Sequence, residues 1–214
     1  MVGIIITGPS GTGKSSFAEL LSSYAGWTLV SKDRIKESCF RTLGCSSREE
    51  SKEIGQLALT QMTSMISQHR SPGDITIFEG NLRTSWLEKV CGPQSPGGIG
   101  QFVQVQMSAP RAVLESRILA RAASGDRHQG HFDLSALRDN AREISTGRFK
   151  TARIPGVVVR LDTTEINRQL LQAEARRVAS IALRLLLPSP LLASPPSMPL
   201  PCRAIGPAQV QNVP

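Results

Sequence analysis

The residues with the clearest chemical meaning stand near the start of the chain, as Gly8-Pro9-Ser10-Gly11-Thr12-Gly13-Lys14-Ser15. They fit the pattern G-x-x-x-x-G-K-[ST], in which the backbone N–H groups of a glycine-rich turn surround a polyphosphate. The Lys14 ammonium would reach the β- and γ-phosphates, and the Ser15 hydroxyl would be a ligand of Mg²⁺. Together with the following Ser16, this stretch is predicted to bind ATP. The alternative is a glycine-rich turn that binds nothing.

The residues on either side of this motif predict a strand followed by a helix. Residues 2–7 are apolar and β-branched, as in a buried parallel strand. Phe17, Leu20, Leu21 and Tyr24 recur at the spacing of one helix face. The motif therefore lies at a strand-to-helix turn, where the positive end of the helix dipole favours phosphate.

Asp33 follows the second predicted strand, residues 27–31, directly. Ligands of doubly wound sheets bind beyond the carboxyl ends of the strands. A carboxylate at that place can accept the proton of an attacking hydroxyl or orient the hydroxyl for in-line attack. Asp33 is thus the candidate catalytic base. The alternative is that it caps the next helix.

Glu79 closes the third predicted strand, residues 75–79. An acidic residue at this position is expected near Mg²⁺ or its water shell, so Ser15 and Glu79 are the candidate metal ligands. Glu79 could instead end the strand in solvent. The following Gly80 lets the chain turn, which would leave Asn81 and Arg83 at the rim of the cleft.

Three arginines predict a lid over about residues 117–140. Arg117 and Arg121 are spaced i, i+4 on one helix and so face the same way, and Arg127 follows in a stretch rich in turn residues. Phosphoryl transfer spreads negative charge that such arginines can neutralise while excluding water. The alternative is a helix with solvated arginines. Nearby His128 and His131 suggest a metal, but contacts with substrate or backbone suit them better.

The order of elements predicts an α/β fold. Strand-like runs at 2–7, 27–31, 75–79, 101–107 and 156–161 alternate with helical stretches, as in a parallel sheet built from βαβ units. Ser47-Arg48-Glu49-Glu50 resembles a capping box. It would open a long helix whose buried residues are expected to be Ile54, Leu57, Ala58, Met62 and Met65.

Length and composition predict one domain over 1–187 and a tail over 188–214. The tail holds eight of the 14 prolines and one charged residue, a composition typical of disorder. The 214 residues carry a net charge of +8, which lies mainly beyond residue 110. No apolar stretch is long enough to span a membrane, and there is no signal-peptide pattern, so we expect a cytoplasmic protein. The four cysteines form no C-x-x-C pair.

Taken together, these motifs resemble the small P-loop kinases of the polynucleotide kinase, zeta-toxin and chloramphenicol phosphotransferase group, a set of AAA-type ATP-binding kinases. The resemblance covers about residues 2–165. It implies a three-layer fold with strand order 2-3-1-4-5, Asp33 as general base, and lid roles for Arg117, Arg121 and Arg127. It also implies that adenine lies near Asp162 and Thr163. Lys36 stands where polynucleotide kinases carry an arginine, so the bidentate contact of a guanidinium is lost.

We therefore expect an ATP- and Mg²⁺-dependent kinase that phosphorylates a hydroxyl of a small molecule, such as a sugar, a nucleoside or an antibiotic. A polynucleotide 5′-hydroxyl kinase is the alternative that would use the positive charge, although only 4% of residues are aromatic. A non-catalytic nucleotide-binding switch or partner-binding module is the third possibility. The absence of an N-K-x-D motif disfavours a GTPase.

Overall fold

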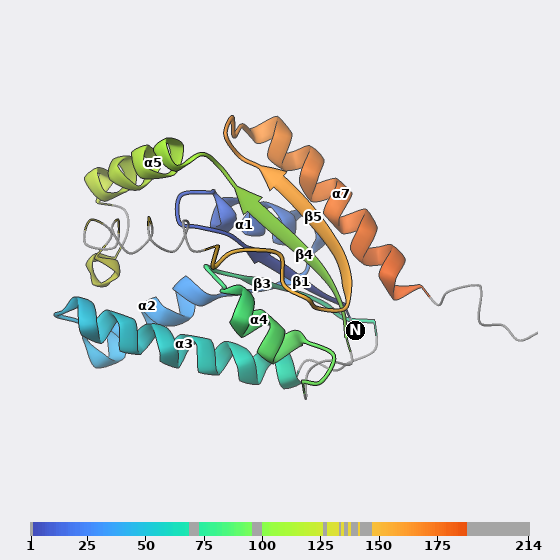
Figure 1. Ribbon diagram of the computed structural model, residues 1–214, viewed down its shortest axis with the longest axis horizontal. Helices are drawn as coiled ribbons and strands as arrows, with labels where there is room; N and C mark the ends of the chain where they lie inside the picture. The colour runs from blue at the N-terminus through green and yellow to red at the C-terminus, as the bar shows by residue number, and fades with distance from the viewer. Residues whose placement is uncertain are drawn as a thin grey trace, which may run out of the picture.

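Five parallel strands form one sheet in the order β2-β3-β1-β4-β5 (Figure 1). The predicted fold class and strand order are confirmed. The strands are β1 (Val2–Thr7), β2 (Thr28–Ser31), β3 (Ile75–Glu79), β4 (Gln101–Ser108) and β5 (Gly156–Asp162).

The computed structural model describes residues 2–68, 73–95, 100–125, 128–132 and 147–187, with positions 134, 137 and 141. The predicted tail at 188–214 lies outside these residues, as do Arg127 and parts of the predicted lid.

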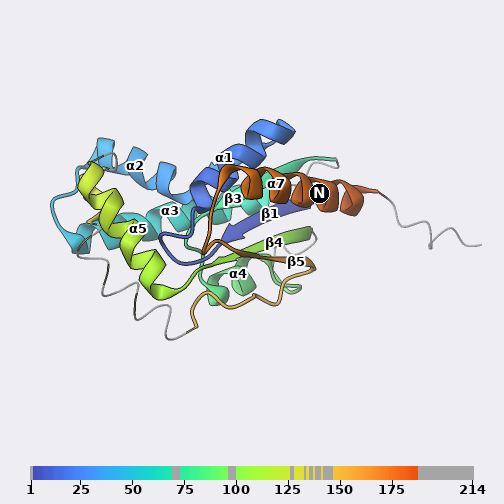
Figure 2. The ribbon, with the colours of Figure 1, turned by 90° about the horizontal axis from the view of Figure 1, so that it is seen from above.

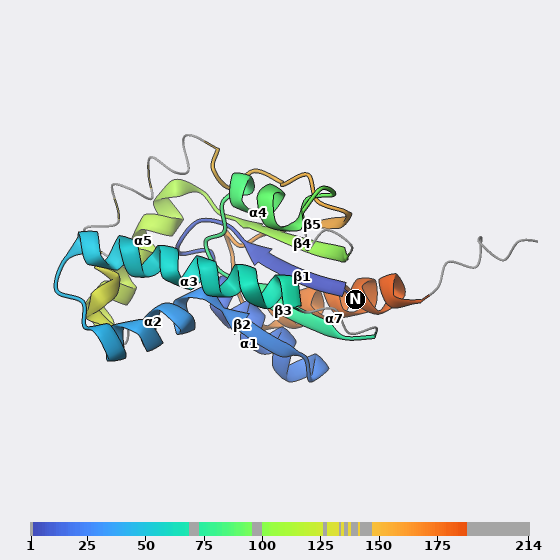
Figure 3. The ribbon, with the colours of Figure 1, turned by 90° about the horizontal axis from the view of Figure 1, so that it is seen from below.

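Helices cover both faces of the sheet and make three layers (Figures 2 and 3). One face packs against α1 (Lys14–Ala25) and α7 (Arg168–Leu186), and the other against α3 (Arg48–Gln68) and α4 (Thr84–Cys91). Within the described residues, no helix has the length and apolar character needed to cross a membrane.

The central strand β1 shows why the sheet is buried on both faces. All six of its residues are buried. Ile4 and Ile6 belong to the core under α1 and α7, whereas Ile5 belongs to the core under α3 and α4. Alternation along a strand turns successive side chains to opposite faces, so a continuous apolar run fits a strand covered twice.

Two helices bury fewer of their apolar side chains than the sequence predicted. Tyr24, in the last turn of α1, is 58% exposed, while Phe17 and Leu21 are buried. In α3 the side chains of Leu57 and Met65 are 48% and 41% exposed, so burying them was a wrong prediction. The buried face of α3 runs instead through Ile54, Ala58, Met62 and Ile66, which follows the i, i+4 spacing more strictly.

The start of α3 follows the predicted capping pattern in part. The Glu50 backbone N–H donates to Ser47 Oγ at 3.1 Å, as a capping box requires. The Glu50 carboxylate accepts from the backbone N–H of Ser46 at 2.7 Å rather than from that of Ser47. These hydrogen bonds from Ser46 lower the pKa of Glu50.

The carboxyl ends of β1, β2 and β3 bring the predicted catalytic residues to one edge of the sheet. The register pairs Ser31 of β2 with Glu79 of β3, and Glu79 with Ile6 of β1. Beyond this edge lie α2 (Lys32–Leu43) and α5 (Arg111–Ser124), and the short 3₁₀ helix η1 (Gln129–His131) follows α5 (Figure 1). The site is therefore built where strand ends meet helix starts.

Candidate active site

The glycines of the phosphate-binding motif adopt backbone conformations that other residues rarely take. Gly8 has φ 147°, and a Cβ there would lie 2.2 Å from the Met107 carbonyl oxygen. Gly13 has φ 82°, and a Cβ there would lie 2.6 Å from Ile166 Cδ1. The turn between β1 and α1 can close only with glycine at these positions.

Within the loop, Lys14 and Thr12 converge on one carbonyl. Lys14 Nζ donates to the Pro9 oxygen at 2.7 Å, and Thr12 Oγ1 donates to the same oxygen at 3.0 Å. Lys14 is 8% exposed, and Thr12 is fully buried. The lysine side chain is thus held against the carbonyl of its own loop. Ser10, Gly11, Gly13 and Ser16 line the same pocket as Lys14.

Glu79 joins the loop to the second strand. Its Oε1 accepts from Ser15 Oγ at 3.3 Å, and its Oε2 accepts from Ser31 Oγ at 2.8 Å. Burial raises the pKa of Glu79 above its ordinary value; the Lys14 charge opposes this shift, and the Asp33 charge adds to it. Hydroxyl and carboxylate oxygens are the ligands that Mg²⁺ prefers, so the predicted metal ligands Ser15 and Glu79 fit the ion chemically.

Asp33 lies in the first turn of α2 and lines the pocket that contains the loop and Glu79. Ser31, the N-cap residue of α2, makes no side-chain capping bond, and its hydroxyl donates to Glu79. On the other side of Asp33, Lys32 Nζ donates to Asn81 Oδ1 at 2.8 Å. Asn81 is thereby held at the pocket wall, as its position after Gly80 predicted.

The two predicted lid arginines that the structure describes have different surroundings. Arg121 lines the pocket. The guanidinium of Arg117 donates instead to three backbone carbonyls, those of Gly11, Thr163 and Thr164, at 3.3, 2.7 and 3.1 Å. Arg117 therefore ties α5 to the phosphate-binding loop and to the segment after β5. Arg127 lies outside the described residues.

The predicted adenine-side residues lie at the end of β5. Thr163 is buried, and its hydroxyl donates to the Ser108 carbonyl at 3.0 Å. Asp162 is exposed and accepts hydrogen bonds from the Thr164 hydroxyl and backbone N–H, which lower the pKa of Asp162. Through Arg117 this segment is joined to Gly11, which places it beside the loop.

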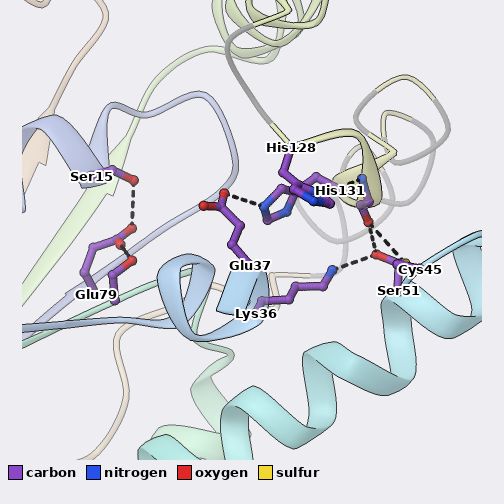
Figure 4. A network of polar contacts seen from close by, with 10 residues as sticks. Ser15, Lys36, Glu37, Cys45, Ser51, Glu79, His128 and His131 are labelled. Carbon is purple, nitrogen blue, oxygen red and sulfur yellow. Dashed lines mark hydrogen bonds and ion pairs between the residues drawn. The ribbon is translucent and has the colours of Figure 1, made fainter. Parts of the chain in front are cut away.

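A second group of side chains, which includes His128 and His131, gathers on the far side of Glu37 from the Ser15–Glu79 pair (Figure 4). His131 Nε2 lies 2.9 Å from Glu37 Oε1, joining η1 to α2. The Phe40 ring stacks on His128 at 5.0 Å and meets His131 edge-on at 5.4 Å. The His128 Nδ1 accepts from the Gly130 N–H at 3.1 Å, so this histidine makes the backbone contact that its turn-rich surroundings suggested.

The same segment is fixed to α3 by a buried chain of hydrogen bonds. Lys36 Nζ donates to Ser51 Oγ at 2.8 Å, and Ser51 Oγ donates to the Gly130 carbonyl at 2.6 Å (Figure 4). Ser51 is fully buried, and the Lys36 Nζ also lies 5.1 Å from the centre of the Phe40 ring. In the sequence, the one indication of these contacts is that Lys36 and Glu37 stand three and four residues after Asp33 and therefore share its helix face.

The phosphate-binding loop and the group around Glu37 and His131 border one cavity of about 410 Å³. Its wall includes residues of the loop, Glu79, Asp33, Lys36, Glu37, Arg48, Asn81, Arg121 and His131. The exposed pair of Arg34 and Glu19, at 2.7 Å, stands at its border. The cavity thus has one end built for phosphate and another formed by α2, the start of α3 and η1.

Residues 4–144 match the family model described as the AAA domain. The chain belongs to this family. The match covers the phosphate-binding loop, Asp33, Glu79 and most of the described cavity wall. No curated protein matches the chain.

Solved structures agree with this family. A protein from Chloroflexus aurantiacus J-10-fl, provisionally named as a kinase, is 28% identical and covers 84% of this chain and 97% of its own, with a TM-score of 0.66. A gluconokinase from Sinorhizobium meliloti 1021 is 17% identical, covers 86% and 94%, and has a TM-score of 0.51. A sugar kinase from Janibacter sp. HTCC2649 is 13% identical, covers 86% and 98%, and has a TM-score of 0.53. This member of the AAA domain family therefore has the fold of small P-loop kinases.

Proposed function

We propose that this protein is an ATP- and Mg²⁺-dependent kinase that transfers the γ-phosphoryl group to a hydroxyl of a small molecule. The observation that carries the proposal is the shared cavity, in which Lys14, Ser15 and Glu79 stand at one end and Asp33 faces the remaining space. A nucleotide-binding switch needs the first group but has no use for a carboxylate at the place of Asp33.

In the proposed reaction, Asp33 accepts the proton of the acceptor hydroxyl, and the oxygen of that hydroxyl forms a bond to the γ-phosphorus. The bond between the γ-phosphorus and the bridging oxygen breaks, and ADP leaves with the electron pair. Lys14 and Arg121 stabilise the charge on the transferred group. Mg²⁺, when bound, neutralises phosphate charge. Ser15 and Glu79 are the residues that would hold it.

Arg117 has a positioning role in this proposal. Its guanidinium bonds to the carbonyls of Gly11, Thr163 and Thr164, so it fixes the loop against the segment that would border the nucleotide. Arg121, one helical turn further along α5, lines the cavity and is the arginine assigned to the phosphates.

Substitution of Asp33 by Asn tests the catalytic assignment. General base catalysis contributes roughly 10²- to 10⁴-fold to rates, so kcat for phosphoryl transfer should fall by that factor while the Kd for ATP stays near the wild-type value. ADP release in the presence of acceptors and calorimetry with MgATP measure the two quantities. Asp74→Asn, at the opposite end of the sheet before β3, is the matched control. Undiminished turnover in the Asp33 variant would remove the base from the proposal.

A further inference from the structure

The cavity wall opposite the loop carries polar chemistry that phosphoryl transfer from ATP does not itself require. We call this the acceptor end and define it by Lys36 and Glu37 of α2, Arg48 of α3, Asn81 and His131. Figure 4 shows Glu37 between the Ser15–Glu79 pair and the group formed by Lys36 and Ser51. The acceptor must enter here, because the loop occupies the other end.

The acceptor end is suited to a polar molecule without an aromatic ring. Among the described residues that line the cavity, Leu29 is the single large apolar side chain, and there is no Phe, Tyr or Trp. Phe40, which packs on His128 and His131 behind the wall, is 3% exposed and does not line the cavity. Bases bind proteins largely by stacking on aromatic side chains, so this wall offers a nucleobase little.

The Glu37–His131 pair offers the contacts that neighbouring hydroxyls need. Its two atoms lie 2.9 Å apart, His131 is 6% exposed, and the side chain of Glu37 remains 31% exposed. An ionised carboxylate only accepts hydrogen bonds, whereas an imidazole nitrogen donates or accepts. A hydroxyl beside the pair can donate to the exposed Glu37 carboxylate, which the buried histidine orients.

The spacing of Asp33 and Glu37 ties this pair to the reacting hydroxyl. Four residues along a helix rise roughly 6 Å and return to the same face. A single sugar-sized molecule spans that length, with one hydroxyl at Asp33 and others at Glu37. The volume of about 410 Å³, shared with the triphosphate, also suits a small acceptor.

The pair is held in place before any acceptor binds. Gly130, the residue before His131, accepts from the buried Ser51 hydroxyl at 2.6 Å, and Ser51 accepts from Lys36 Nζ at 2.8 Å. A site whose side chains are fixed by a supporting layer of hydrogen bonds binds with a smaller entropy loss.

We propose that the acceptor is a non-aromatic polyol, either a sugar or a sugar acid, whose hydroxyls are bound by Glu37 while Asp33 faces the hydroxyl that is phosphorylated. This inference rests on the proposed kinase function and narrows it to one substrate class. It also gives Glu37 the role of an acceptor-binding residue and His131 that of a positioning residue.

The test measures ADP release by the full chain with three groups of acceptors: sugars, polyols and sugar acids; nucleosides; and single-stranded oligonucleotides. Transfer should be confined to the first group. Glu37→Gln and His131→Gln should each raise KM for the preferred polyol roughly 10-fold or more, since each removes a hydrogen bond involving a charged or buried group. KM for ATP should change less than about twofold in both variants, because neither side chain belongs to the loop.

Glu115→Gln is the matched control, since Glu115 forms a comparable pair with Arg111, at 2.7 Å, on the exposed part of α5. Thermal unfolding of every variant separates lost binding from lost folding. Preference for nucleosides or oligonucleotides, or an unchanged KM for the polyol in folded Glu37 and His131 variants, overturns the inference and leaves the kinase function standing. ATP binding without transfer to any acceptor overturns the kinase function and the inference with it.

Discussion

The two ends of the cavity are built in different ways. At the nucleotide end the geometry comes mainly from the backbone: a glycine turn and the register of β1, β2 and β3 bring the hydroxyls of Ser15 and Ser31 to Glu79. At the acceptor end it comes from side chains of separate elements. His131 and Glu37 are 94 residues apart, and Ser51 and Gly130 are 79 apart, with no strand register between them.

This difference implies that the two ends can change independently. Replacing Gly8, Gly11 or Gly13 disturbs a left-handed backbone conformation that favours glycine, so changes at these positions should destroy the site. Replacing Glu37 or His131 alters a wall that the strands do not build. One phosphate-binding end can therefore serve many acceptors, which is how related folds come to host different functions.

The strongest test of the nucleotide end is Lys14→Ala. A hydrogen bond to a charged group is worth about 1.5–3 kcal/mol, so the Kd for MgATP should rise roughly 10- to 150-fold. Thermal unfolding should change little, because the ammonium bonds within its own loop to the Pro9 carbonyl. Calorimetry with MgATP measures the affinity.

Lys32→Ala is the control for Lys14, since Lys32 also lines the cavity but bonds to Asn81 at the wall. If Lys14→Ala bound MgATP as tightly as the natural chain, the assignment of this end to the triphosphate would be lost, and with it the contrast between the two ends.

How far the sequence predicts each end follows from the same contrast. The motif at residues 8–16, the apolar runs of the strands and the acidic residues at or just after their ends are all local signals, so the parallel α/β fold and the positions of Asp33 and Glu79 could be predicted. Parallel strands then bring these positions to one edge without further information. The strand order was implied by the family resemblance.

The acceptor end could not be predicted in this way. Nothing local in Ser51 or Gly130 indicates that they meet, because their contact depends on how α3 and η1 pack. Arg117 and Arg121 are both arginines on one helix face. Arg117 nevertheless donates to backbone carbonyls, whereas Arg121 lines the cavity. Helical spacing predicts which face of the helix a side chain occupies, but tertiary packing decides which group that side chain contacts.

Ser51→Ala tests whether the acceptor end is held by its supporting hydrogen bonds. The substitution leaves Lys36 Nζ and the Gly130 carbonyl without this buried partner, which should lower the free energy of unfolding by about 1–3 kcal/mol. The Kd for MgATP should stay unchanged, because the loop is not involved. Urea unfolding and calorimetry measure the two quantities.

Thr60→Ala on the same helix is the matched control, since its hydroxyl is exposed and bonds only to the Gln56 carbonyl within α3. A Ser51 variant as stable as the Thr60 variant would show that η1 is held without this chain of hydrogen bonds. A weaker affinity of the Ser51→Ala variant for MgATP would show instead that the two ends are coupled, which would contradict the inference that they can change independently.

The smallest expected effect concerns Glu79, whose buried carboxyl is 2% exposed and belongs to the nucleotide end. Because burial raises its pKa above the ordinary value of a glutamate, the folded chain binds this proton more tightly than the unfolded chain does. The stability that this proton contributes is complete below the ordinary pKa and is lost as the pH rises through the pKa of the folded state. In the ligand-free protein, Glu79→Gln should therefore increase the free energy of unfolding near pH 7, with a smaller increase at pH 4. Urea unfolding at both pH values measures this difference, with Glu53→Gln on the exposed face of α3 as the control.

A Glu79→Gln variant that loses equal stability at both pH values would contradict this prediction. It would mean that the hydrogen bonds from Ser15 and Ser31 outweigh the cost of burying the carboxylate charge, so that the ionised Glu79 is already stabilised before Mg²⁺ or ATP binds.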